Sequence, residues 1–161
     1  MTNTIYMKTK LLLCVFVFFF GICYTTAQED DAYKKFLKTT SVAIHKAQKE
    51  MMAAKKTDVN GLLAKAVILQ SNALRLYKEQ KISEGVCNSN LSRKYATEII
   101  KNISGNVAAY YLIHDDEKTL IGNCGDETEL YNLSKKNMKN LSESDKDYMN
   151  MKALNNTNID F

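Results

Sequence analysis

The densest group of side chains that could do chemistry is the run His114, Asp115, Asp116 and Glu117. One imidazole and three carboxylates could bind a cation, or could serve as general acid and general base. Consecutive residues rarely converge on one ion, and the spaced acids and central glycine of a calcium-binding loop are missing from this run. The pattern therefore favours a solvated loop, with a catalytic or metal-binding role as the alternative.

Cys87 and Cys124 form the second candidate pair. The other two of the four cysteines lie within the first 27 residues, which read as a cleavable signal peptide, as described below. Two cysteines that remain in an exported chain predict a disulfide. Closing a loop of this length could contribute about 4 kcal/mol by restricting the unfolded chain. A zinc site built from this pair with His45 and His114 is the alternative, but it lacks the paired ligand spacing of such sites.

The remaining sequence offers no familiar catalytic pattern. It contains no Gly-x-Ser-x-Gly, no His-Glu-x-x-His, no Cys-x-x-Cys and no glycine-rich phosphate loop. His45 lies beside Ile44, far from the second histidine, and is predicted to flank a helix rather than to bind a metal. We therefore expect no cofactor and no metal, and an enzyme whose site is assembled only by folding stays open as an alternative.

Two long helices are the elements most clearly indicated. Apolar or small residues recur every three or four positions in residues 30–55 and again in residues 57–81, which is typical of amphipathic helices. Thr57 and Asp58 are expected to cap the second helix. The seam positions are Tyr33, Leu37, Thr40, Ile44, Ala47, Met51 and Ala54, and then Val59, Leu62, Ala66, Leu69, Ala73 and Leu76. The short connection predicts an antiparallel hairpin that forms half of the core.

The following segment begins with a predicted connection over residues 82–90, in which Asn88 and Asn90 are available to cap a third helix. Apolar positions from Leu91 to Ile103 mark that helix, and the glycine at position 105 is expected to end it. Residues 107–113 are ambiguous between a short helix and a strand, and helix is favoured because a lone strand has no partner.

The C-terminal part is predicted to contain a polar loop over residues 114–126, a helix from Thr128 and a last short helix that starts near Ser142. Residues 155–161 are expected to be frayed. With no proline and few glycines, the chain is predicted to be all-α, a small helical bundle led by the long hairpin. The disulfide would join the start of the third helix to the loop before the fourth.

The first 27 residues read as a cleavable signal peptide. Lys8 and Lys10 precede an apolar run over residues 11–22, and small residues lead to a cleavage point after Ala27. The run is shorter than the roughly 20 residues that a spanning helix needs. Lipid attachment at Cys23 is disfavoured by the bulky Ile22 before it. We expect a secreted or periplasmic protein whose residues 28–161 form one domain, with no stable membrane anchor after cleavage.

The charge pattern argues against nucleic acid as a partner. Loss of Lys8 and Lys10 lowers the formal net charge from +4 to +2, and nucleic-acid binders usually concentrate their cations. The lysines of the first helix are predicted to form its solvated side, with an acidic partner as the alternative; they are Lys34, Lys35, Lys38, Lys46 and Lys49. Tyr95 and Tyr110 are predicted at the margin of the core, although tyrosine is also favoured at binding surfaces.

Five Asn-x-Ser/Thr acceptors are the last pattern. They begin at Asn90, Asn102, Asn132, Asn140 and Asn155. In a eukaryotic secretory pathway they would be sites for surface glycans, and in a bacterium they would have no such meaning.

Three function classes remain. The leading hypothesis is a non-catalytic, exported protein that binds a protein partner outside the cytoplasm, for example as an inhibitor or immunity-type protein, with the half that contains Cys87 and Cys124 as the contact surface. The second is a carrier of a small apolar ligand, held in a cavity lined by methionines such as Met51, Met52 and Met138. The third is an enzyme with an unrecognised site.

Overall fold

The computed structural model describes the backbone of residues 3–56 and 59–138, and the side chains of residues 29–56, 59 and 61–138. These residues form five α-helices and one 3₁₀ turn, and the described part of the chain has no strand. The chain divides into two units, Met1–Ala32 and Tyr33–Phe161. The first contains only the start of helix α1 (Asn3–Ala54), and the second contains the bundle.

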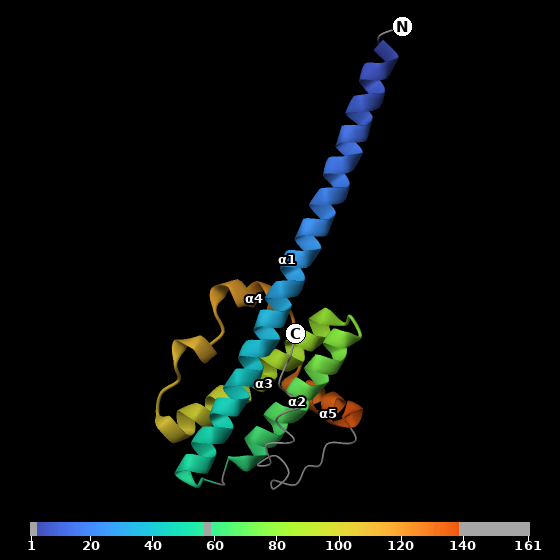
Figure 1. Cartoon of the computed structure of the whole chain (residues 1–161). Helices are drawn as coiled ribbons and strands as arrows, with labels where there is room; N and C mark the ends of the chain where they lie inside the picture. Colours follow the sequence, from blue (N-terminus) through green and yellow to red (C-terminus); the bar gives the residue numbers. More distant parts are fainter. Residues whose placement is uncertain (1–2, 57–58, 139–161) are drawn as a thin grey trace. The chain divides into compact units, whose positions relative to one another are not determined.

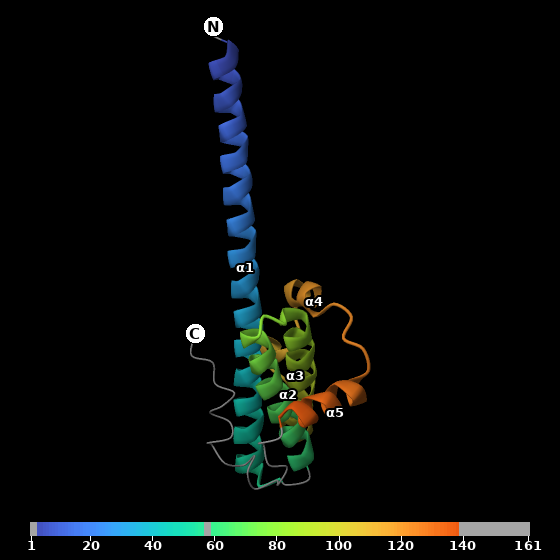
Figure 2. The same ribbon diagram turned by 90° about the vertical axis from the view of Figure 1, so that its right-hand side faces the viewer.

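The predicted helical hairpin is confirmed. Residues 33–54 of α1 run antiparallel to α2 (Asn60–Lys78), and α3 (Ile82–Ser104) lies beside α2 (Figures 1 and 2). Most of the predicted seam is buried, including Leu37, Ile44 and Met51 from α1 and Leu69 and Ala73 from α2. Helix α2 begins at Asn60, with Val59 at its N-cap position, so the predicted start is early by about three residues. Thr57 and Asp58 lie outside the described residues.

Helix α3 begins much earlier than predicted, because the expected connection over residues 82–90 is already helical. Gly85 lets α3 approach α2 closely, since a Cβ built at this position would lie 3.2 Å from the carbonyl oxygen of Ala73 on α2. Asn88 does not cap the helix; its side chain is buried inside it and hydrogen-bonded. At the other end the prediction holds, because Gly105 closes the helix in the left-handed conformation at φ 74°.

The remaining elements pack around the bundle (Figure 2). A 3₁₀ turn, η1 (Ala109–Tyr111), replaces the helix that was favoured for residues 107–113. Helix α4 (Asp115–Ile121) occupies most of the predicted polar loop over 114–126, and α5 (Glu127–Asn137) crosses α2 and α3 (Figure 2). Asp126 caps α5 as its side chain accepts from the amides of Thr128 and Glu129. The predicted last helix and the frayed end lie outside the described residues.

Candidate functional site

The segment 107–113 presents two large side chains to solvent. Tyr110 is 56% exposed and Leu112 is 47% exposed, while Tyr111 between them packs against the core. The segment is held at both ends, by Gly105 at the end of α3 and by the amide of His114, which donates to Glu117 Oε2 at 3.0 Å. The exposed side chains are therefore carried by an ordered turn.

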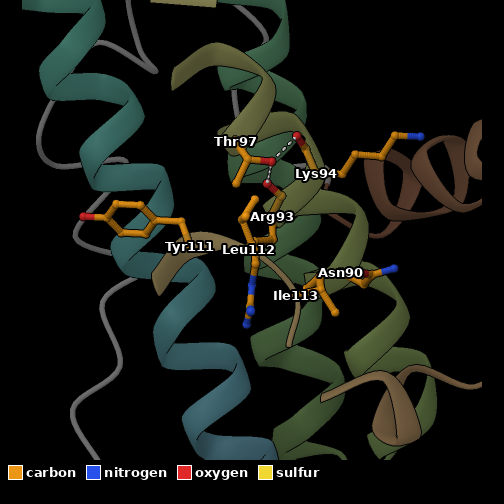
Figure 3. A pocket seen from close by; sticks show the side chains of 7 residues that line it. All are labelled: Asn90, Arg93, Lys94, Thr97, Tyr111, Leu112 and Ile113. Atoms are coloured by element: carbon orange, nitrogen blue, oxygen red, sulfur yellow. Dashed lines mark hydrogen bonds between the residues drawn. The ribbon is translucent and has the colours of Figure 1, made fainter. Parts of the chain in front are cut away.

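A cavity of about 270 Å³ opens between this segment and α3. Figure 3 shows Tyr111 pointing away from α3 toward α1, while Leu112 and Ile113 lie along the cavity wall. The lining residues are Asn90, Arg93, Lys94, Thr97, Tyr111, Leu112 and Ile113. The cavity thus has a mostly apolar wall from the segment and a polar wall from α3.

A second cavity, of about 400 Å³, is lined in part by Tyr110. Its lining combines a cation, a phenol and carboxylates from three elements: Lys35, Thr39, Tyr110, His114, Asp116 and Glu117. The segment 107–113 therefore borders two hollows, so that a partner contacting Tyr110 or Leu112 could also fill the space beside them.

A buried ion pair contributes a wall to each cavity. Arg93 is 1% exposed, and its Nη1 lies 2.9 Å from both carboxylate oxygens of Glu117. Its Nε donates to Thr40 Oγ1 at 2.9 Å, and its Nη2 donates to the Phe36 carbonyl at 2.7 Å. The guanidinium carbon lies 4.2 Å from the centre of the Phe36 ring. This one side chain therefore joins α1, α3 and α4.

Burial and pairing act in opposite directions on this arginine. Burial lowers the pKa of Arg93, and the hydrogen bonds and charge of Glu117 oppose that shift. Because the guanidinium stays charged at any physiological pH, Glu117 balances a charge that has left water. The geometry indicates a structural role, because the guanidinium of Arg93 and the carboxylate of Glu117 are hydrogen-bonded to each other.

The predicted reactive run does not assemble as one site. Asp115 and Asp116 are exposed in the first turn of α4, while Glu117 turns inward to Arg93. The expected solvated loop is thus wrong for Glu117, because an opposite buried charge draws it into the bundle. Among the described residues, no group of three or more His, Cys, Asp and Glu side chains could hold a metal ion.

The predicted disulfide is confirmed. Cys87 and Cys124 are joined, with their Cα atoms 5.2 Å apart, and the bond links the start of α3 to the loop before α5. Because both sulfurs are consumed in this bond, the alternative zinc site with His45 and His114 has lost its thiolate ligands. The bond borders a further cavity of about 240 Å³ under α5.

A buried amide cluster beside the disulfide was missed by sequence reasoning. Asn72 Nδ2 donates to Asn88 Oδ1 and to Ser134 Oγ, both at 3.1 Å. The Asn72 Oδ1 accepts from Arg75, and Asn88 Nδ2 donates to the Glu84 carbonyl at 2.8 Å. The cluster adds hydrogen bonds between α5 and helices α2 and α3 to the contact of Tyr131 with the core.

Arg93 was missed as well, although the sequence carries a signal for it. Val86, Ser89, Arg93, Ala96 and Ile100 follow one another at spacings of three and four along α3, and all are buried. A charged residue in such a series predicts a buried charge that needs a partner. What the spacing could not supply is Glu117, which lies 24 residues further along the chain.

The tyrosine predictions divide. Tyr95 is half-buried against the core as expected, with Lys65 Nζ 5.6 Å from its ring centre. Tyr110 was expected at the core margin and is instead exposed, because the 3₁₀ turn directs Tyr111 inward in its place.

His45 and the methionines were the residues considered for a metal site and for an apolar-ligand cavity. Burial, followed by the charge of Lys49, lowers the pKa of His45, which is half-buried on the flank of α1. Met51 is fully buried in the core and Met52 is 52% exposed, so these two do not line one ligand cavity.

No family model, curated protein or solved structure matches the chain. Among the residues whose side chains the structure describes, no helix is long and apolar enough to cross a membrane.

Proposed function

We propose that the chain is an exported, non-catalytic protein that binds another protein outside the cytoplasm through the segment 107–113. The observation that carries this proposal is the exposure of Tyr110 and Leu112 on either side of the partly buried Tyr111. Large side chains held in place before binding lose little conformational entropy on association, and tyrosine is enriched where interfaces concentrate their energy. An inhibitor or immunity-type role is one form of this function.

The buried ion pair supports the proposal because it supplies rigidity. Arg93 and Glu117 hold the start of α4, and the same Glu117 carboxylate accepts from the amide that ends the segment. Export is supported by the candidate signal peptide over residues 1–27 and by the bond between Cys87 and Cys124, because disulfides persist in oxidising compartments.

Site-specific crosslinking tests the proposal. A photo-crosslinking amino acid is placed at position 110 or, as the control, at Leu133, which is 51% exposed on α5 outside the segment. Each protein is expressed in its native cells, and crosslinked products from the envelope and medium fractions are identified by mass spectrometry. We expect one protein to be captured from position 110 and not from position 133.

Binding of the purified captured partner then measures the contribution of the segment. The double variant Tyr110→Ser/Leu112→Ser is expected to lose at least about 10-fold in affinity, as contact residues of this type often do, while Leu133→Ser keeps it. The proposal fails if position 110 captures no macromolecule, or if both variants bind the partner as the wild type does.

A further inference from the structure

Helix α1 carries a marked asymmetry of charge. Residues 33–49 contain five lysines and no acidic residue, whereas residues 50–161 contain 15 basic and 15 acidic residues. All of the excess positive charge after position 32 therefore lies in this one stretch of helix.

The structure places much of this charge on one exposed side of α1. Lys35, Lys38 and Lys49 are exposed, and so is Val42 between them. Positions three, four or seven residues apart lie on one side of a helix, and 14 residues span about 21 Å. The opposite side is buried in the bundle through Phe36, Leu37, Thr40, Ile44, Ala47 and Met51. We call Lys35, Lys38, Val42 and Lys49 the lysine face.

The lysine face is largely unneutralised by its neighbours. No acidic partner lies within salt-bridge distance of Lys35, Lys38 or Lys49 among the described residues. Two neighbouring acids already have partners: Glu50 pairs with Lys46, and Glu117 pairs with Arg93.

Asp116 is an exposed acid beside the lysine face, because it lines the same cavity as Lys35. At the far end of the face, the acid next to Lys49 in the chain is Glu50, which is paired with Lys46. The field of the lysines acts on His45, whose lowered pKa has Lys49 as a cause after burial.

We propose that the lysine face binds an anionic, phosphate-bearing lipid surface, independently of the protein partner proposed above. A helix on the outside of a bundle presents a convex ridge, which suits a flat surface better than it suits an extended peptide. All the cations of the face are lysines, whose compact charges act through diffuse attraction, whereas specific pairing with carboxylates favours arginine. Val42, 37% exposed, adds an apolar contact at the centre.

Vesicle sedimentation tests this proposal with the protein purified from its own cells, its N-terminus defined by intact mass. The probes are vesicles of phosphatidylcholine alone and of phosphatidylcholine mixed with phosphatidylglycerol. We expect binding only to the anionic vesicles, with a marked loss when salt is raised from 50 to 500 mM in the assay. The triple variant Lys35→Gln/Lys38→Gln/Lys49→Gln is expected to lose about 100-fold, since each lysine contributes about fivefold.

The matched control removes the same charge elsewhere. Lys78, Lys101 and Lys136 are exposed on α2, α3 and α5, and their triple change to glutamine should leave vesicle binding within about twofold. Equal loss in both triple variants would show that net charge alone acts and would overturn the proposal. Binding to neutral vesicles as strongly as to anionic ones, or binding only to soluble polyglutamate, would also overturn it. Circular dichroism of each variant establishes that the helices are retained.

Discussion

The two ends of the helical bundle are built on different principles. At one end, residues 43–51 of α1, 59–68 of α2 and 96–100 of α3 form a cluster of buried aliphatic side chains. At the other end lie buried polar groups: Arg93 pairs with Glu117 beside the ring of Phe36, and Asn72 donates a hydrogen bond to Asn88. We call these the aliphatic end and the polar end.

The two ends differ in the kind of interaction that holds the helices together. Aliphatic packing depends on shape and volume and tolerates exchange of one apolar residue for another of similar size. A buried polar network depends on every partner, because an orphaned group keeps its desolvation cost. The outer elements attach to both ends. Tyr111 of the segment 107–113 and Tyr131 of α5 pack against the aliphatic cluster. Glu117 of α4 and Ser134 of α5 are held by the buried polar groups. The proposed binding surface therefore depends on both kinds of packing.

The largest expected effect comes from breaking the ion pair at the polar end. Glu117→Ala leaves the buried Arg93 charge without a partner and should lower the free energy of unfolding by about 3–5 kcal/mol. Urea denaturation followed by circular dichroism measures the change. Asp115→Ala is the control, because its pair with Lys118 is exposed and should contribute little.

The apolar double variant Arg93→Met/Glu117→Leu sharpens this test. Removing both charges leaves neither uncompensated, so the double variant should recover most of the stability that Glu117→Ala loses. If Glu117→Ala unfolds at the same urea concentration as the wild type, the ion pair does not stabilise the polar end.

The aliphatic end should respond more strongly to lost volume than to changed shape. Ile99 is fully buried there, and Ile99→Ala should cost about 2–5 kcal/mol through lost contacts and the cavity left behind. Ile99→Leu keeps the volume and should cost less than about 1.5 kcal/mol. Thermal unfolding of both variants measures the difference, and equal losses would contradict the assignment of this end to volume-based packing.

The amide cluster gives the matching test at the polar end, where volume is not the deciding quantity. Asn72→Leu nearly conserves size but removes the partner of Asn88, Ser134 and Arg75, at a cost of about 1–3 kcal/mol. Hydrogen exchange should show the amides of α5 opening first, because Ser134 lies on that helix. Asn102→Leu, at an exposed position, should stay within about 0.5 kcal/mol of the wild type.

The same division explains how much could be predicted from the sequence. The helical hairpin was predictable because Ile44, Ala47 and Met51 repeat at helical spacing and bury together with Ala66. The disulfide was predictable from the expected export and the even number of cysteines after position 27. Both inferences use local spacing or composition, which a single sequence contains.

The polar end was less predictable because its signals are long-range. Serine, glycine and asparagine at positions 83–90 indicate a loop by local preference, yet Gly85 permits close packing and Asn88 finds partners on α2 and α5. Glu117 lies in an acidic run that reads as solvated until Arg93 is placed beside it. Residues 107–113 were ambiguous because a short apolar run has no distinguishing period.

The smallest expected effect concerns a feature that both ends share. Helices α1 and α2 are each followed by a non-glycine residue in the left-handed conformation, Lys55 at φ 51° and Gln80 at φ 60°. After Gln80, the end of α2 is capped by a backbone hydrogen bond, in which the amide of Lys81 donates to the carbonyl oxygen of Leu76 at 2.9 Å. Side chains with a Cβ are strained there by about 1–2 kcal/mol, while glycine loses about 0.5–1 kcal/mol more entropy on folding.

Gln80→Gly and Lys55→Gly should therefore each raise the free energy of unfolding, by up to about 1 kcal/mol. The gains should be similar at the two ends, because the strain lies in the backbone and not in the surrounding core. Gln80→Ala is the control, since alanine keeps the Cβ and should give no gain. Thermal denaturation measures all three variants, and a gain at only one end would show that the surrounding packing, rather than φ, sets the strain.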